Sequence, residues 1–135
     1  MTIKERYEGW QLEIIGDGPL YRKVTDPTII WKGELTREHI SASLGSAAFL
    51  VLPSHYDNNP LVIIEAMACG VPVLASRVGG IPEMISEQTG RIIPAQASKA
   101  LEEGLAHMID HHASYDRPLI RDQFLSKYAL SLIHI

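Results

Sequence analysis

A single acidic side chain interrupts an otherwise apolar segment in the middle of the sequence. The helix that we predict over residues 60–69 (PLVIIEAMAC) is apolar at every position except Glu65, so we expect it to be buried nearly all round. Burying an ionised carboxylate is costly unless it meets a donor, a cation or a ligand with hydroxyl groups. Glu65 is therefore a candidate ligand-binding residue, and pairing with a structural donor such as a loop N–H is the alternative.

A strand and a polar turn deliver the chain to this helix. The apolar run over residues 47–52 predicts a strand, and residues 54–59 (SHYDNN) form a turn after it. Asn59 is a competent N-cap, and Pro60 is favoured at the first helical position because its missing N–H would have had no partner there. Asp57 is a second carboxylate within this turn, where its simplest role is to cap the turn itself.

Short apolar runs alternate with helical segments over the rest of the chain. We expect strands at residues 12–15, 28–31, 47–52, 72–75 and 90–94, and helices at residues 20–25, 36–45, 60–69, 97–111 and 119–128. Thr36 can cap the second of these helices, Gly70 ends the third, and the fourth carries an apolar stripe at Leu101, Leu105, Met108 and Ile109. This alternation predicts a doubly wound, Rossmann-like α/β fold with a parallel sheet and helices on both faces, in a single domain over residues 1–135.

The fold class predicts where a ligand would bind. In open α/β sheets ligands lie outside the carboxyl ends of the strands, where helix N-termini favour phosphate, and the loops at residues 16–19, 53–59 and 76–80 are expected there. The common nucleotide fingerprints are absent from the sequence. Gly16-x-Gly18 lacks the third glycine of a dinucleotide motif, and no glycine-rich loop ends in Lys-Ser or Lys-Thr. The glycine turn by itself does not identify the ligand.

Composition and charge exclude several classes of protein. The 135 residues are 46% hydrophobic and 21% charged, as in an ordinary globular domain, and the net charge of −4 argues against nucleic acid as a partner. The single cysteine, Cys69, fits a packing role in a reduced compartment. Because no secretory signal or membrane-spanning run is visible, we expect a cytoplasmic protein, with a peripheral place at the inner membrane face open to the intact protein.

Five short motifs follow one another along the chain: IIGDGP at residues 14–19, WKG at 31–33, LPS at 52–54, PLVIIEAMACGVPVLAS at 60–76 and GGIPEMI at 79–85. In this order and spacing they resemble the C-terminal, nucleotide-sugar-binding domain of GT-B retaining glycosyltransferases, the glycosyltransferase group 1 family. The resemblance implies a nucleoside diphosphate sugar as the donor substrate, with no metal and no other cofactor.

The resemblance also implies roles for individual residues. The family's hallmark is two glutamates separated by seven residues, and the second falls on Glu65, which would hold the ribose hydroxyls. The first falls on Asp57, a shorter acid at the catalytic position that faces the transferred sugar, and the missing methylene could alter its reach. The backbone N–H groups of Leu61 and Val62 would face the diphosphate. The remaining donor-binding positions would be cleft glycines and a strand end beside the base: Gly16, Gly79, Gly80, Trp31 and Lys32.

The sequence departs from the family at its start. Family members carry an arginine and a lysine that neutralise the diphosphate, ahead of the strand that corresponds to residues 12–15, and Lys4 and Arg6 do not replace them. We expect the first strand and the N-terminal acceptor domain to be missing too. The chain alone is then a donor-binding domain that binds nucleotide weakly and transfers no sugar, with its incomplete sheet open to self-association. The alternative is a non-catalytic nucleotide-sugar-binding or self-associating module.

Simple structural interpretations compete at other positions. His107, His111 and His112 have the helical spacing of a metal-binding pair, but they lie at a polar helix end far from the predicted cleft, so we expect no metal. Gly79 serves backbone geometry whether or not it also lines a ligand. The alternative for Trp31 is packing in the core rather than contact with a ligand.

Overall fold

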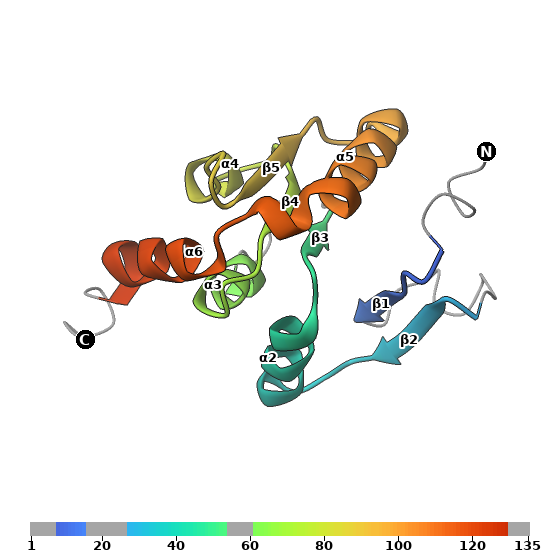
Figure 1. Cartoon of the computed structure of the whole chain (residues 1–135), viewed down its shortest axis with the longest axis horizontal. Coiled ribbons are helices and arrows are strands. Elements are labelled where there is room, and N and C mark those ends of the chain that lie inside the picture. Colours follow the sequence, from blue (N-terminus) through green and yellow to red (C-terminus); the bar gives the residue numbers. More distant parts are fainter. Residues whose placement is uncertain (1–7, 16–26, 54–60, 130–135) are drawn as a thin grey trace. The chain divides into compact units, whose positions relative to one another are not determined.

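The computed structural model describes residues 8–15, 27–53 and 61–129 (Figure 1). The contacts within the chain divide it into two compact units, Met1–Ile40 and Ser41–Ile135. Among the described residues each unit has a parallel sheet of its own, with two strands in the first unit and three in the second. The predicted α/β class with parallel pairing is confirmed in both.

The first unit contains strands β1 (Leu12–Ile15) and β2 (Ile29–Gly33), which pair in parallel. Leu12 lies opposite Ile29, and its N–H donates to the carbonyl oxygen of Thr28 at 2.9 Å. Both strands were predicted, and β2 extends two residues further than expected. The predicted helix at residues 20–25 lies outside the described residues.

Helix α2 (Arg37–Ser46) begins where Thr36 was expected to cap it. The His39 N–H donates to the Thr36 hydroxyl at 3.3 Å, and the Ile40 N–H donates to the Thr36 carbonyl oxygen at 2.9 Å. A threonine oxygen accepting from the third helical N–H is a usual N-cap arrangement. The predicted helix at residues 36–45 is therefore confirmed.

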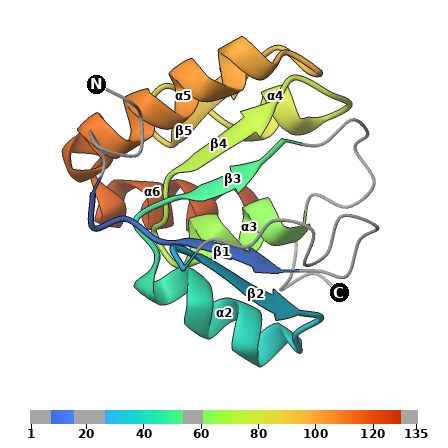
Figure 2. The ribbon, with the colours of Figure 1, turned by 90° about the vertical axis from the view of Figure 1, so that its right-hand side faces the viewer.

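The second unit is built on strands β3 (Leu50–Leu52), β4 (Val73–Ser76) and β5 (Gly90–Ile93), in the spatial order β3-β4-β5. Figure 2 shows β3 and β4 running side by side in the same direction. The strand predicted over residues 47–52 starts three residues late. The Ala47 N–H donates to the Leu44 carbonyl oxygen at 3.1 Å, so the chain is still closing α2 at that point.

Helices cover both faces of this sheet. They are α3 (Leu61–Ala68), the single turn α4 (Ile81–Met84), α5 (Ser98–His111) and α6 (Arg117–Phe124). A 3₁₀ turn at His112–Ser114 precedes α6, and a π turn at Leu125–Ala129 follows it. In Figure 1, α5 lies on one side of β3, β4 and β5, and α3 and α6 lie on the other. This is the doubly wound arrangement that the alternation predicted.

One hydrophobic cluster of the second unit lies between β4, β5 and α5. Leu74, Ile93 and Met108 are buried there, and Leu101 and Leu105 pack against them. These α5 positions form the apolar stripe that the sequence predicted, because residues three and four apart share a helix face. All four residues of β4 are buried, as expected for a parallel strand with helices on both sides.

Helix α3 departs from the prediction in its burial. Ile63, Ala66 and Met67 are buried, but Leu61 is 45% exposed and Glu65 is partly exposed. Leu61 and Glu65 are four residues apart and therefore share one face. α6 packs against α3, but Leu61 remains exposed on this face, so the expectation that α3 is buried nearly all round was wrong.

The end of α3 follows its sequence signal. Gly70 has φ 72°, in the left-handed region that glycine enters without strain. The Gly70 N–H donates to the Met67 carbonyl oxygen at 3.0 Å, and the Val71 N–H donates to that of Ala66 at 2.8 Å. These two bonds form a Schellman motif, which confirms Gly70 as the residue that ends the helix.

Candidate functional site

The carboxyl ends of the strands in the second unit are the place to look for a ligand site in a fold of this class. β4 ends at Ser76, and the chain then turns sharply. The Arg77 N–H donates to the Ile93 carbonyl oxygen at 2.8 Å, and the Val78 N–H donates to the Ser76 carbonyl oxygen at 3.0 Å. These bonds tie the turn to the ends of both β4 and β5.

The predicted pair of glycines lies in this turn. Gly79 has φ 49°, so its backbone conformation favours glycine, and it is exposed. Gly80 occupies the N-cap position of α4, with no side chain to cap the helix. Backbone geometry thus explains Gly79, and the exposed position of both glycines also leaves their backbone accessible to a ligand.

Helix α3 supplies the next part of the site. Leu61 and Val62 are its first two residues, and the first-turn N–H groups of an α-helix are directed at whatever lies beyond its N-terminus. Glu65 follows one turn later on the face that Leu61 shares, and the residue is partly exposed. The catalytic candidate Asp57 lies outside the described residues.

Ser76 is a candidate that sequence reasoning did not single out. It is only 2% exposed, it stands at the carboxyl end of β4, and within the described part of the chain its hydroxyl makes no hydrogen bond. Buried hydroxyls nearly always have a partner. The available signal was a serine closing an apolar run (VLAS) at the edge where ligands bind in this fold class.

Two further predicted residues belong to the first unit. Lys32 lies on β2, and its Nζ forms an ion pair with Glu13 Oε1 at 3.3 Å, with both side chains about one third exposed. Trp31 precedes it, pairs in register with Ile14 and is partly buried. The structure describes these residues within their own unit only. Gly16 lies outside the described residues.

The histidine cluster on α5 has no metal-binding set around it. The His107 and His111 rings are 4.8 Å apart, measured between their centroids. Over residues 8–15, 27–53 and 61–129, no group of three or more His, Cys, Asp or Glu side chains is placed to hold a metal ion.

In the same ranges, no helix has the length and apolar character needed to cross a membrane.

Comparison with known proteins identifies a family. The sequence profile of the family described as "Glycosyl transferases group 1" matches residues 1–111. Among curated proteins, the chain is 37% identical over 90 residues to the sulfoquinovosyl transferase of Arabidopsis thaliana, a match that covers 64% of this chain and 18% of that protein. It is 26% identical over 155 aligned positions to the D-inositol 3-phosphate glycosyltransferase of Mycobacteroides abscessus, covering 95% and 35% respectively.

A comparison of structures agrees. The apo form of the lipopolysaccharide outer core galactosyltransferase WaaB superposes with a TM-score of 0.73 at 24% identity, covering 85% of this chain and 36% of that one. At this identity the likeness concerns the fold, and it confirms the predicted Rossmann-like domain of the GT-B type. The chain spans about a third or less of the length of each of these three proteins.

Proposed function

Because the chain belongs to the glycosyl transferases group 1 family, we propose that it is the donor-binding part of a retaining glycosyltransferase. The intact enzyme would move a sugar from a nucleoside diphosphate sugar to an acceptor hydroxyl. The observation that carries the proposal is the family match over residues 1–111, which includes the whole carboxyl edge from α3 to the glycine turn. Since the chain spans a minor part of its relatives, acceptor binding and transfer are assigned to the larger protein.

In this proposal the diphosphate lies at the N-terminus of α3. The N–H groups of Leu61 and Val62 and the positive end of the helix dipole favour an anion there. Arg77 supplies a cation at the same edge: it directly follows β4, its side chain is exposed, and its backbone is held by the bond to Ile93. An arginine fork suits phosphate oxygens. In the family, an arginine and a lysine ahead of the strand that corresponds to β1 neutralise the diphosphate. Arg77 would supply part of that positive charge in this chain.

Glu65 is the proposed ligand of the ribose. A carboxylate accepts hydrogen bonds only, and the two neighbouring ribose hydroxyls can both donate to it. The partial exposure of Glu65, on the same face as Leu61, supports this role, because a ligand at the helix N-terminus could reach it. Gly79 and Gly80 would line the cleft with backbone alone.

Asp57 is the proposed catalytic residue. It would position the transferred sugar and stabilise the positive charge that develops at the reacting carbon, while the α3 N-terminus stabilises the departing diphosphate without a metal ion. Configuration at that carbon would be retained. For the 135-residue chain alone we propose nucleotide binding without sugar transfer.

Calorimetric titration tests the donor site. UDP, GDP and ADP would be compared with their 2′,3′-dideoxy forms against the wild-type chain, Glu65→Gln and, as a matched control, Glu102→Gln on the exposed face of α5. Hydrogen bonds to a charged group are worth about 1.5–3 kcal/mol, so Glu65→Gln should weaken binding of the preferred ribonucleotide about 10- to 160-fold. The dideoxy form should bind both proteins alike.

Two outcomes would contradict the proposal. One is the absence of any nucleoside diphosphate binding at millimolar ligand by the folded chain. The other is an equal loss of affinity for the ribonucleotide and its dideoxy form in Glu65→Gln, which would place the carboxylate away from the ribose. Sugar transfer by the chain alone would separately overturn its assignment as a binding part.

A self-associating module is the second candidate function. Two large apolar side chains of β1 favour it, because Leu12 is 47% exposed and Ile15 is 39% exposed. Apolar strand surface of this kind marks interaction sites. Sedimentation velocity over a range of concentrations tests it: a dimer that Leu12→Glu dissociates would support self-association through β1, and a monomer at all concentrations would exclude it.

A further inference from the structure

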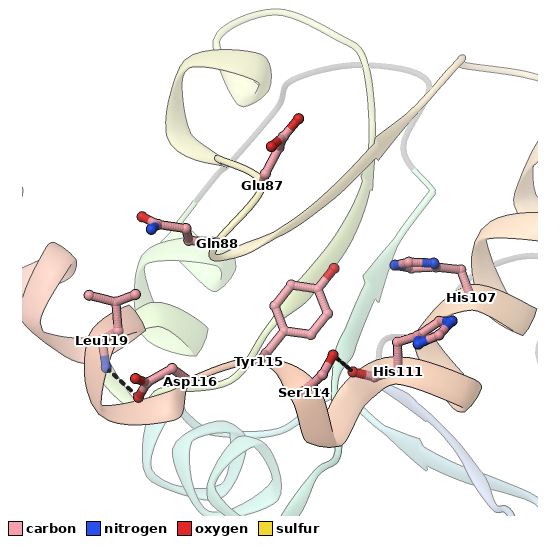
Figure 3. A pocket seen from close by; sticks show the side chains of 8 residues that line it. All are labelled: Glu87, Gln88, His107, His111, Ser114, Tyr115, Asp116 and Leu119. Atoms are coloured by element: carbon pink, nitrogen blue, oxygen red, sulfur yellow. Dashed lines mark hydrogen bonds between the residues drawn. The ribbon is translucent and has the colours of Figure 1, made fainter.

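A pocket of about 350 Å³ lies in the second unit, away from the carboxyl edge (Figure 3). Its wall comes from the turn before β5, the last turns of α5 and the start of α6. The polar side chains that line it include Glu87, Gln88, His107, His111, Tyr115 and Asp116.

The topology places this pocket at the amino ends of the strands. Glu87 and Gln88 lie in the turn that ends one residue before β5, whose first residue, Gly90, pairs with Val73 at the start of β4. α5 leaves the carboxyl end of β5 and runs back along the sheet, so its last turns return to the amino edge. The pocket therefore lies at the opposite edge of the sheet from Ser76 and the glycine turn.

Hydrogen bonds within the chain hold parts of the wall in place. The Ser114 hydroxyl donates to the His111 carbonyl oxygen at 2.7 Å. Asp116 Oδ1 accepts from the Leu119 N–H at 3.1 Å, and Gln88 Oε1 accepts from Gln123 Nε2 at 2.7 Å. These three hydrogen bonds hold the residues around the pocket in place, which favours a site that is formed before a ligand binds.

Other polar groups of the wall remain available. Within the described part of the chain, neither the Tyr115 hydroxyl nor the His107 ring makes a hydrogen bond. Figure 3 shows the Tyr115 hydroxyl and the His107 ring directed into the same space from two sides. Both side chains are partly buried, so they can present their polar atoms to a bound molecule with limited competition from water.

The charge state of these groups selects the ligand class. Burial, the positive charge of Arg91 and the neighbouring His111 lower the pKa of His107 below its ordinary 6.5, against a smaller opposing effect of Asp110. Burial raises the pKa of Tyr115 above 10.0, against the effect of Arg91. Near neutral pH both side chains are therefore uncharged, and each can donate and accept a hydrogen bond.

A sugar hydroxyl has the same dual capacity. The carboxylates of Glu87 and Asp116 add acceptors to the wall. Their two negative charges outnumber the one positive charge of Arg91 that acts on His107 and Tyr115, a balance that opposes anions such as phosphates and sugar acids. The volume is at the lower end of the range for small-molecule sites, about 300–1,000 Å³, so it suits a ligand of about one ring.

We propose that this pocket binds a neutral sugar ring, with Tyr115 and His107 hydrogen-bonding its hydroxyl groups. The site is separate from the donor site and does not depend on it. The ring could be a free monosaccharide or one unit of a glycan chain, and both offer the same chemistry to the pocket.

Nuclear magnetic resonance titration of the full 135-residue chain tests the proposal. The probes are methyl α-glucopyranoside, methyl α-mannopyranoside, maltotriose and, as a charged comparison, glucuronate. A saturable shift of the Tyr115 and His107 signals with at least one neutral probe, and a weaker effect of glucuronate, is expected. Tighter binding of maltotriose would assign the site to a glycan chain, and equal binding would assign it to a single ring.

Two tyrosine variants separate binding from folding. Tyr115→Phe removes one hydroxyl, and a neutral hydrogen bond of about 0.5–1.5 kcal/mol corresponds to about 2- to 13-fold weaker binding. Tyr128→Phe, in the π turn after α6, is the matched control and should bind as the wild type does. Unchanged circular dichroism would confirm that both variants fold.

Three results would overturn the proposal. They are no saturable shift with any neutral probe, equal or stronger binding of glucuronate, and unchanged binding by Tyr115→Phe. UDP provides a further arm, because it should leave the Tyr115 and His107 signals in place. A UDP-induced shift of these signals would show that the pocket is not a separate site. This result would not depend on whether the calorimetric titration supports the donor site.

Discussion

The guanidinium of Arg117 donates through Nε to the carbonyl oxygen of Gly70 at 2.9 Å. Its Nη2 donates to the carbonyl oxygen of Ala47 at 3.3 Å. Arg117 is the first residue of α6, Gly70 ends α3, and Ala47 follows α2. One partly buried side chain therefore joins three helix ends, because it donates hydrogen bonds to the carbonyl oxygens of residues that follow α3 and α2, where helix termini lack hydrogen-bond partners within the helix.

Replacing Gly70 by alanine should destabilise the chain. Gly70 has φ 72°, and a Cβ there would lie 2.8 Å from the Arg117 carbonyl oxygen. The left-handed conformation alone costs a residue with a Cβ about 1–2 kcal/mol, and the backbone contact adds to it. Urea unfolding followed by circular dichroism should show a lower midpoint for Gly70→Ala.

Gly45→Ala is the matched control for that experiment. Gly45 lies in α2, and no atom lies within 4 Å of the position of its added Cβ. Alanine is favoured over glycine in a helix by up to about 1 kcal/mol, so this variant should be as stable as the wild type or more stable. Equal unfolding midpoints for the Gly70 and Gly45 variants would contradict our account of the α3 terminus.

Arg117→Gln should also lower the free energy of unfolding. The substitution removes charge-assisted bonds to Gly70 and Ala47, each worth about 1.5–3 kcal/mol in typical proteins, although the loss is reduced because Arg117 is partly exposed to water. Arg121→Gln, on the exposed part of α6, should change stability little. If the two arginine variants lost similar amounts of unfolding free energy, the hydrogen bonds from Arg117 to Gly70 and Ala47 would contribute no stability.

Ser76→Ala should separate stability from binding. Because the buried Ser76 hydroxyl has no partner within the described part of the chain, removing it should leave the free energy of unfolding unchanged or raise it. If a bound donor supplies that partner, the same variant should bind nucleoside diphosphates about 2- to 13-fold more weakly. Unfolding curves and calorimetry on one preparation measure both quantities, and a clear loss of stability would refute the unpartnered hydroxyl.

Stability should depend on pH through His107. Its folded-state pKa lies below 6.5, so the unfolded chain binds the proton more readily. The contribution of His107 to stability is then complete above pH 6.5 and is lost as the pH falls through the folded-state pKa. Urea midpoints measured across this window should fall more steeply for the wild type than for His107→Gln, and parallel curves would contradict the assignment.

Element types and their order were predictable because they rest on local signals. The Thr36 cap, the Gly70 terminator and the apolar stripe of α5 each involve residues only a few positions apart, and all three are present. The family was predictable for the same reason, since its motifs are short and follow one another in order along the chain.

The exposure of α3 was not predictable in the same way. Its composition (LVIIEAMA) indicates that it can bury nearly every face, but which face is covered depends on where α6 packs. The face that carries Leu61 and Glu65 is exposed at Leu61 and partly exposed at Glu65, which the composition of the helix did not indicate.

Local signals in the amino-acid sequence were thus sufficient for the family, the α/β class and the order of the described helices and strands, although several bounds differ by two or three residues. Packing alone determined the rest: the reach of Arg117 to carbonyls 47 and 70 positions away, the buried hydroxyl of Ser76, and a pocket with a wall that extends from Glu87 to Leu119. The physical reason is range. Caps and periodicity act within about one or two helical turns, whereas burial and long-range hydrogen bonds exist only once distant segments have come together.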